Sequence, residues 1–390
     1  MGIHELGKLL REKGIRPDTV ALSRFRGRRI AIDVGGFAYA SYAKANEKIV
    51  NKTDLAVQMP DVNEIRLEWF KFILRFTDTF MKHDVTPVFV FDGEPRPEKA
   101  GTRAIRVNNR QKNVDEIEET CKRLDQQSVL EKTEEDIEKL RRKLIQTPHV
   151  RFADLKALRK FVDALGLPWF CAQYDAEQLC SILCIEGYCA ATLSKDGDTL
   201  AFGCPIVLLK NEKRNDPEDG TPQYQCYELQ TVLDGLALDY PSFVDMCIIM
   251  GCDFNKSPEN PTGSPMKQIG HNRAYELINN FGCIENIPQC RPGFVDRDKL
   301  TFIPSFRSAP KIDYPIKNLH YRICRGIFTY TTSQSFTVKG NGDILPYDET
   351  KMKQVLATYS LALSLTSILK QKEKLAAPSS EPHHKIYLLA

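Results

Sequence analysis

Acidic residues follow several short apolar stretches of this sequence. Asp33 and Asp92 each end such a stretch, and the others come after later stretches: Asp175, Glu177, Asp196, Asp198 and Asp253. If several of these carboxylates converge, each close pair of charges costs about 4 kcal/mol at roughly 4 Å separation and an effective dielectric of about 20, so a cation has to compensate them. Ligand sets made of oxygen atoms alone select hard divalent cations, Mg²⁺ or Mn²⁺ in a cell. Two such ions, about 3.5 to 4 Å apart, would activate water and stabilise both the attacking and the leaving oxygen at a phosphodiester.

Each acid taken alone also has an ordinary structural explanation. Asp175 is a suitable N-cap for the helix that follows it, and Glu177 suits the positive end of the helix dipole. Asp196-Gly197-Asp198 is a common turn sequence. The joint placement of the acids after successive strands favours a shared site over these separate explanations.

An open, mostly parallel α/β sheet flanked by helices is expected to position the acids. Residues 28–33 and 87–92 are predicted buried strands, and apolar residues recur at helical spacing between Ile65 and Phe80. Strand, helix and strand imply a right-handed parallel crossover. Further predicted elements are strands at 167–172, 188–193 and 205–209 and a helix from Asp175 to about Glu186. Ligands of such sheets bind outside the carboxyl ends of the strands, so the acids should share one edge.

A highly charged segment interrupts this pattern between Gly93 and about Lys143. We expect it to be helical and exposed. It is basic at its start, with Arg96, Lys99, Arg103, Arg106, Arg110 and Lys112. Residues 291–348 mix proline, glycine and aromatic residues without a clear period, and no element is predicted there.

Composition narrows the class of protein. Of the 390 residues, 42% are hydrophobic and 27% are charged, which is typical of a soluble globular chain and excludes collagen-like and mainly disordered proteins. No apolar run is long enough to span a membrane, and the first residues lack the layout of a signal peptide, so we expect a soluble intracellular protein. The 12 cysteines include no Cys-x-x-Cys pair and are expected to be reduced core residues rather than zinc ligands. The net charge of +3 neither requires nor excludes a nucleic-acid partner.

The chain resembles the structure-specific 5′ nucleases of the XPG type, most closely the flap endonucleases. The resemblance rests on segments that match in order and at similar spacing: residues 1–3, 30–33, 87–95, 172–177, 196–203 and 250–253. It extends from the first residue to about Phe281. It implies a PIN-like nuclease core with a helical arch insertion and a helix-turn-helix extension that binds DNA.

The resemblance also implies roles for individual residues. The seven acids look like the two-metal site of the family, with Mg²⁺ replaceable by Mn²⁺. Lys99 and Arg106 match basic residues that contact the scissile phosphate at the base of the arch; seven residues apart on a helix, they would share a face. Tyr39 matches an aromatic residue that stacks on a base beside the cut, with a core tyrosine as the alternative. The expected DNA-binding residues are Gly2, Tyr39, Arg103, Gly270, Asn272 and Arg273.

The chain departs from the family pattern in two places. Gln268 replaces the first glycine of the usual helix-turn-helix sequence, so the sequence does not decide whether the family's K⁺ site is kept. The C-terminal residues contain no recognisable motif for binding a sliding clamp. The expected organisation is a nuclease core at 1–92 and 147–255, an arch at 93–146, a helix-turn-helix element at 256–300, a C-terminal extension at 301–375 and a flexible tail at 376–390.

The expected function is Mg²⁺-dependent cleavage of 5′ flaps or other branched DNA in replication, repair or recombination. A 5′-3′ exonuclease of the same family and an RNA-degrading relative are alternatives, and an inactive nucleic-acid-binding scaffold is a remote one. We expect a monomer, located in the nucleus or at another site of DNA synthesis, or in the cytoplasm if the protein is viral.

Overall fold

The computed structural model describes residues 3, 5–126, 133–195, 197–215, 221–255, 269–287, 319–330 and 338–358. Its centre is an eight-stranded sheet with the order β1-β7-β6-β5-β2-β3-β4-β8. The strands are β1 (Asp18–Ala21), β2 (Arg29–Asp33), β3 (Thr86–Phe91), β4 (Trp169–Cys171), β5 (Ala191–Leu193), β6 (Ile206–Asn215), β7 (Pro222–Glu228) and β8 (Lys339–Asn341). Neighbouring strands from β6 to β4 run parallel, whereas β1, β7 and β8 are antiparallel additions at the two edges.

The central strands are buried on both faces. Ile30 and Ile32 of β2 pack into one apolar cluster, whereas Ala31 between them packs into a second cluster on the opposite face. This arrangement explains why the central strands are continuous apolar runs rather than alternating ones. The predicted mostly parallel α/β sheet is therefore confirmed.

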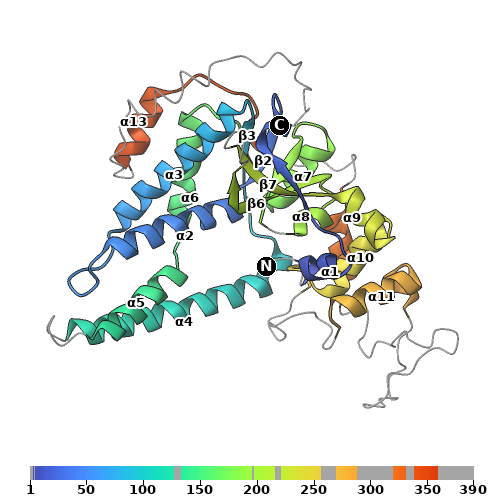
Figure 1. Ribbon diagram of the computed structural model, residues 1–390, viewed down its shortest axis with the longest axis horizontal. Helices are drawn as coiled ribbons and strands as arrows, with labels where there is room; N and C mark the ends of the chain where they lie inside the picture. The colour runs from blue at the N-terminus through green and yellow to red at the C-terminus, as the bar shows by residue number, and fades with distance from the viewer. Residues whose placement is uncertain are drawn as a thin grey trace.

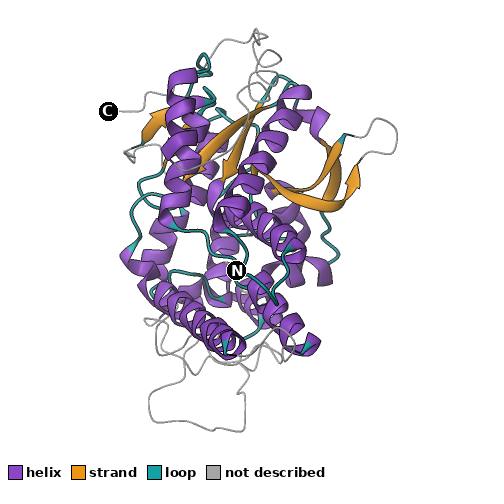
Figure 2. Ribbon diagram, turned by 90° about the vertical axis from the view of Figure 1, so that its left-hand side faces the viewer, coloured by secondary structure: helices purple, strands orange, loops and turns teal. Residues whose placement is uncertain are grey.

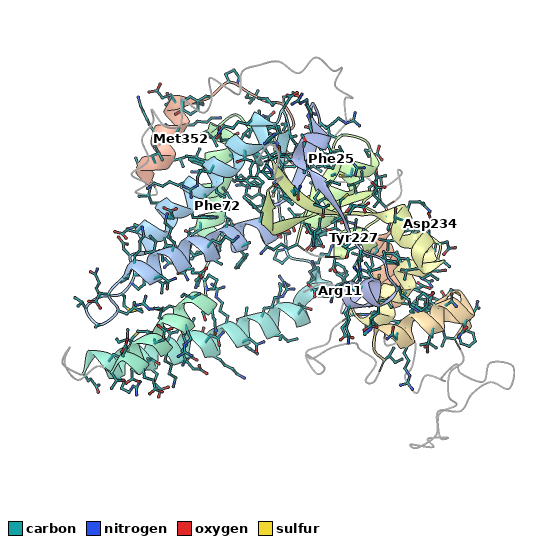
Figure 3. The ribbon with its side chains drawn as sticks, viewed as in Figure 1. Arg11, Phe25, Phe72, Tyr227, Asp234 and Met352 are labelled. Carbon is teal, nitrogen blue, oxygen red and sulfur yellow. The ribbon has the colours of Figure 1, made fainter. Side chains whose placement is uncertain are left out.

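Helices cover both faces of the sheet (Figure 1). One face carries α2 (Val34–Lys52), α3 (Val62–Lys82), α6 (Phe152–Ala164) and α13 (Glu349–Thr358). The other face carries α1 (Leu6–Glu12), α7 (Ala176–Ile185), α8 (Asp198–Ala201), α9 (Leu229–Leu236), α10 (Tyr240–Met250), α11 (His271–Phe281) and α12 (Tyr321–Phe328). Single 3-10 turns lie at Leu22–Phe25, Pro97–Lys99 and Ile284–Asn286. Met352 of α13, labelled in Figure 3, is fully buried and fixes this helix on its face of the sheet.

Two helices of the charged insertion, α4 (Ala100–Asp125) and α5 (Glu134–Gln146), run side by side away from the sheet (Figures 1 and 2). They meet α2 through a small apolar cluster, here called the tip cluster, of Val50, Leu55, Leu124 and Leu140. Arg141 of α5 donates a hydrogen bond of 2.6 Å to the Val50 carbonyl. The far part of the insertion is thus attached to the core at one apolar point.

The described parts of the unassigned segment 291–348 prove to be packed structure. Cys324 and Phe328 of α12 are buried, and the Phe328 ring lies 5.0 Å from that of Phe202 and 5.3 Å from that of Phe254. Arg325 binds the buried carboxylate of Asp245 in α10. These contacts join residues distant in sequence, so no local period could reveal them.

Local details differ from the sequence expectations. The strand expected at 188–193 begins at Ala191, because the Cys189 amide instead donates to the Leu183 carbonyl and closes the end of α7. The edge strands β1 and β8 were not predicted. The 11 described cysteines are free thiols, as expected. Among the described helices, none combines the length and apolar character that crossing a membrane requires.

Candidate active site

The predicted acids gather at the carboxyl edge of the parallel strands. Asp33 ends β2 and caps α2, and Asp92 follows β3. Asp175 stands at the N-cap position of α7, after β4, although its side chain makes no capping hydrogen bond, and Glu177 lies in the first turn of that helix. Asp198 opens α8 and Asp253 follows α10. Asp196 lies outside the described residues.

Close backbone approaches bring Asp33 and Asp92 together. A Cβ atom at Gly35 would lie 3.1 Å from Asp92 Oδ2 and 3.4 Å from Asp33 Oδ1, so this glycine leaves the two carboxylates room beside the start of α2. A Cβ atom at Gly93 would lie 1.9 Å from the Ala172 carbonyl oxygen, so only glycine allows the chain after β3 to run this close to the chain after β4. The chain segments that follow β3 and β4 therefore lie side by side, and the Gly93 amide donates to the Tyr174 carbonyl at 2.7 Å.

The surroundings of the acids favour their protonated, uncharged forms, as the pKa values of two of them indicate. Burial raises the pKa of Glu177 well above its usual range, and the nearby charges of Asp33, Asp198 and Asp92 raise it further. The pKa of Asp92 is also raised by the protein packed around its carboxylate, although the residue keeps contact with solvent. These shifts are the expected result of crowding carboxylates together.

Three basic side chains compensate this charge. Lys99 Nζ lies 2.6 Å from Asp175 Oδ1 and 3.8 Å from Glu177 Oε2. Burial alone would lower the pKa of Lys99, but the Glu177 and Asp175 charges outweigh burial and raise it, so the ammonium stays protonated. Arg106 of α4 lies 2.6 Å from Asp253 Oδ2. Lys99 ends the 3-10 turn before α4, so the two predicted basic residues meet the acids from adjoining elements rather than from one helix.

Arg96 is the third base, and the sequence did not single it out. Its Nε lies 2.6 Å from Asp175 Oδ2, and its side chain is only 11% exposed. The sequence shows Arg96 as one of many basic residues at the start of the charged segment. Its flanking residues, Pro95 and Pro97, are the only local signal, because proline holds the preceding residue in an extended conformation.

The acids have the donor chemistry that Mg²⁺ prefers, and the charges of Asp33, Asp198 and Asp92 add to the effect of burial in raising the pKa of Glu177. In the described part of the chain, however, no three acidic, histidine or cysteine side chains stand close enough together to hold a metal ion. The cations Arg96, Lys99 and Arg106 occupy several of the carboxylate oxygens instead. Metal binding would therefore have to compete with these ion pairs.

The remaining predicted residues that the structure describes belong to α2, α4 and the start of α11. Tyr39 of α2 is 46% exposed, so the alternative of a core tyrosine is wrong. Arg103 is exposed on α4 and donates to the Arg96 carbonyl at 3.4 Å. Gly270 is the exposed N-cap of α11. Gly2 lies outside the described residues.

The start of α11 is bound to α1, which sequence reasoning missed. His271 Nδ1 lies 2.7 Å from Glu5 Oε2, and His271 Nε2 lies 2.8 Å from Glu12 Oε2. Asn272 also donates to Glu12, at 2.8 Å, so the Asn272 side chain serves this junction; Arg273, also in α11, is half-buried. Ahead of α1, the Ile3 amide donates to Asp198 in the site itself.

Two family domains match the chain: the XPG N-terminal domain at residues 1–113 and the XPG I-region at residues 166–253. Together they cover more than half of the sequence and include all seven acids. The chain belongs to the XPG and flap endonuclease family of structure-specific 5′ nucleases. This is a family of DNA nucleases, which are hydrolases, and the resemblance inferred from the sequence is confirmed.

Relatives within this nuclease family are moderately similar in sequence. A flap endonuclease 1 from Fusarium vanettenii is 30% identical over 296 residues, which are 74% of this chain and 66% of that protein. A flap endonuclease 1 from Arthroderma otae is 29% identical with the same coverage. The matched region thus spans slightly less than two thirds of the length of these relatives.

Solved structures of the family confirm the fold. Flap endonuclease-1 from Methanococcus jannaschii aligns with a TM-score of 0.54 at 19% identity, over 92% of this chain and 95% of that one. The catalytic core of Rad2 in complex with DNA substrate aligns with a TM-score of 0.56 at 16% identity, over 96% and 99%. At such identities the likeness establishes the fold and not the substrate.

Proposed function

We propose that this nuclease is a Mg²⁺-dependent enzyme that cuts 5′ flaps and related branched DNA by phosphodiester hydrolysis during replication, repair or recombination. The observation that carries the proposal is the pairing of Lys99 and Arg106, at the base of α4, with the acids at the sheet edge. A phosphate that enters this edge would meet both the acids that bind metal and two cations.

The proposed roles follow from these positions. The seven acids would hold two Mg²⁺ ions, which supply charge neutralisation and activate water when bound. Lys99 and Arg106 would leave their carboxylates and stabilise charge on the phosphate. Tyr39, exposed on α2, would stack on a base next to the cut.

The surrounding elements would guide the DNA. The single 5′ strand would pass beside α4 and α5, whose far part is attached to α2 by the tip cluster. The region of α11, with Gly270 and Arg273, would bind duplex phosphates without reading sequence. We propose a monomer that acts at sites of DNA synthesis, with the domain division expected from the sequence.

A panel of labelled substrates tests the proposal. Single-flap, double-flap, nicked, blunt and RNA substrates are incubated with and without Mg²⁺. We expect Mg²⁺-dependent products from the flaps, cut near the junction. Stepwise shortening of nicked or blunt duplex ahead of flap cutting would indicate an exonuclease, and faster cutting of RNA would indicate an RNA-degrading enzyme.

A pair of variants in α7 ties the activity to the site. Glu177→Gln keeps the shape of the side chain but removes a proposed metal ligand, so cleavage should fall by about 100-fold or more while flap binding is kept. Glu186→Gln changes an exposed acid just past the other end of the helix and should cut normally. Full turnover by Glu177→Gln at saturating Mg²⁺ would rule out the proposed site.

A further inference from the structure

Arg96 is fixed by partners in more than one direction. Its Nε binds Asp175 Oδ2, and its terminal nitrogen donates to Gln178 Oε1 at 2.5 Å. The guanidinium also lies over the Tyr174 ring, 4.3 Å from its centroid. The Gln178 amide in turn donates to the Ile327 carbonyl of α12, at 2.9 Å. A planar guanidinium with donors directed at different acceptors is held more firmly than an ammonium.

Lys99 is in a different situation, although it shares the same carboxylate. Its ammonium binds Asp175 Oδ1, lies 3.8 Å from Glu177 Oε2 and sits 5.0 Å from the Phe254 ring centroid. Its flexible stem allows the ammonium to turn toward another anion. Asp175, in contrast, is 9% exposed at its side chain, so the loss of every cation would leave a buried carboxylate uncompensated.

We propose that Arg96 is a positioning residue that keeps Asp175 paired while Lys99 leaves it for the scissile phosphate. Arg96 thus makes Lys99 available, and it does so from a fixed position that Gln178 links to α12. The inference rests on the proposed function, because it assigns the phosphate as the new partner of Lys99. It also gives α12 a role in supporting the site.

A double-mutant cycle with Arg96→Met and Lys99→Ala tests this coupling. Two quantities are measured for each variant: the single-turnover cleavage rate with Mg²⁺, and the dissociation constant for flap DNA in EDTA. Without Arg96, Lys99 should stay on Asp175, so Arg96→Met should lower the single-turnover rate by about 10- to 100-fold. It should also weaken metal-free flap binding as much as Lys99→Ala does.

The decisive result is the behaviour of the double variant. If Arg96 acts through Lys99, Arg96→Met causes no further loss of rate or of metal-free binding in the Lys99→Ala background. A loss of equal size in both backgrounds would mean that Arg96 only supports the local structure, and would overturn the proposal. An unchanged rate in Arg96→Met would overturn it as well.

Two further variants guard against a folding defect. Arg96→Lys keeps the charge but loses the second donor to Gln178, and should give an intermediate rate. Arg75→Met removes an exposed arginine from α3, paired with Glu68 at 3.1 Å, and should leave rate and binding unchanged. A wild-type protein that cuts no substrate would contradict the proposed function itself. The metal-free binding cycle would then still report whether Arg96 and Lys99 act together.

Discussion

The two ends of the charged insertion are attached to the core by different forces. At the base, Arg106 and its neighbour Lys99 make ion pairs with acids of the site. At the far end, Leu124 and Leu140 are buried in the tip cluster. Apolar burial is insensitive to salt and to metal ions, whereas exposed ion pairs are screened and open to competition. The base is therefore the part of the insertion that the proposed substrate and metal ions would rearrange, and the tip is the part that would stay attached.

Truncating the tip cluster should have the largest effect on this contrast. Leu140→Ala removes a buried side chain, and comparable changes cost about 2 to 5 kcal/mol. Amide hydrogen exchange in α5 should accelerate strongly, at low and high salt alike. Val107→Ala, at an exposed position of α4, serves as the control and should exchange like the wild type. Equal protection of α5 in Leu140→Ala and wild type would show that the cluster does not hold the tip.

Salt should act on the base more than on the tip. The Arg106 side chain is 46% exposed, so its pair with Asp253 is worth about 1 kcal/mol or less and weakens as ionic strength rises. Between about 0.05 and 0.5 M salt we expect amide exchange in the first turns of α4 to rise by a factor of about five or less. Exchange in α5 should change less, because the buried tip cluster holds this helix in addition to its ion pairs with α4. A salt response of the same size at both ends would remove the distinction.

A change in pH should affect the base of the insertion and the charged junction of α1 and α11 differently. Burial alone would lower the pKa of His271, but Glu5 and Glu12 raise it above the ordinary histidine value of 6.5. A raised pKa means that this contribution to stability is complete below pH 6.5 and is lost as pH rises through the folded value. At the base, the Lys99 ammonium keeps its charge throughout this range, because the charges of Glu177 and Asp175 raise its pKa.

Two histidine variants give opposite signs in this test. The melting temperature of the wild type should fall between about pH 6 and pH 8 as His271 loses its proton, and His271→Gln should abolish this fall. Burial lowers the pKa of His149, and Arg110 and Arg151 lower it further, so His149 destabilises the fold at acid pH. His149 should therefore make the melting temperature rise with pH as it loses its proton, and His149→Gln should abolish this rise. Shifts of the same sign in both variants would contradict the assigned pKa directions.

The sequence was a good guide where function depends on local order along the chain. Strands β2 and β3 are apolar runs that end at or next to an acid, and parallel pairing then places Asp33 and Asp92 at one edge. The same reasoning placed Asp175 after β4, whereas Asp253 follows the helix α10 rather than a strand. Periodicity and position were sufficient because each acid is positioned by the strand or helix next to it.

The contacts that sequence reasoning missed all join distant segments. Arg96 reaches Asp175, 79 residues later, and His271 reaches Glu5, 266 residues earlier. Apart from the prolines on either side of it, nothing local distinguishes Arg96 from the other bases of its segment, and nothing local distinguishes His271 from an exposed histidine at a helix start. Such roles depend on packing of whole elements, which is also why α12 was not predicted.

The hydrogen bond from Ile3 to Asp198 involves a main-chain donor. Every residue except proline carries this amide, so most substitutions at position 3 would preserve the bond, and a comparison of side chains would not detect its importance. Only a change in chain length before α1, or proline at this position, would remove the donor. The main chain of Ile3 therefore reaches the acidic edge of the sheet, while its side chain packs into the apolar cluster on one face of the sheet.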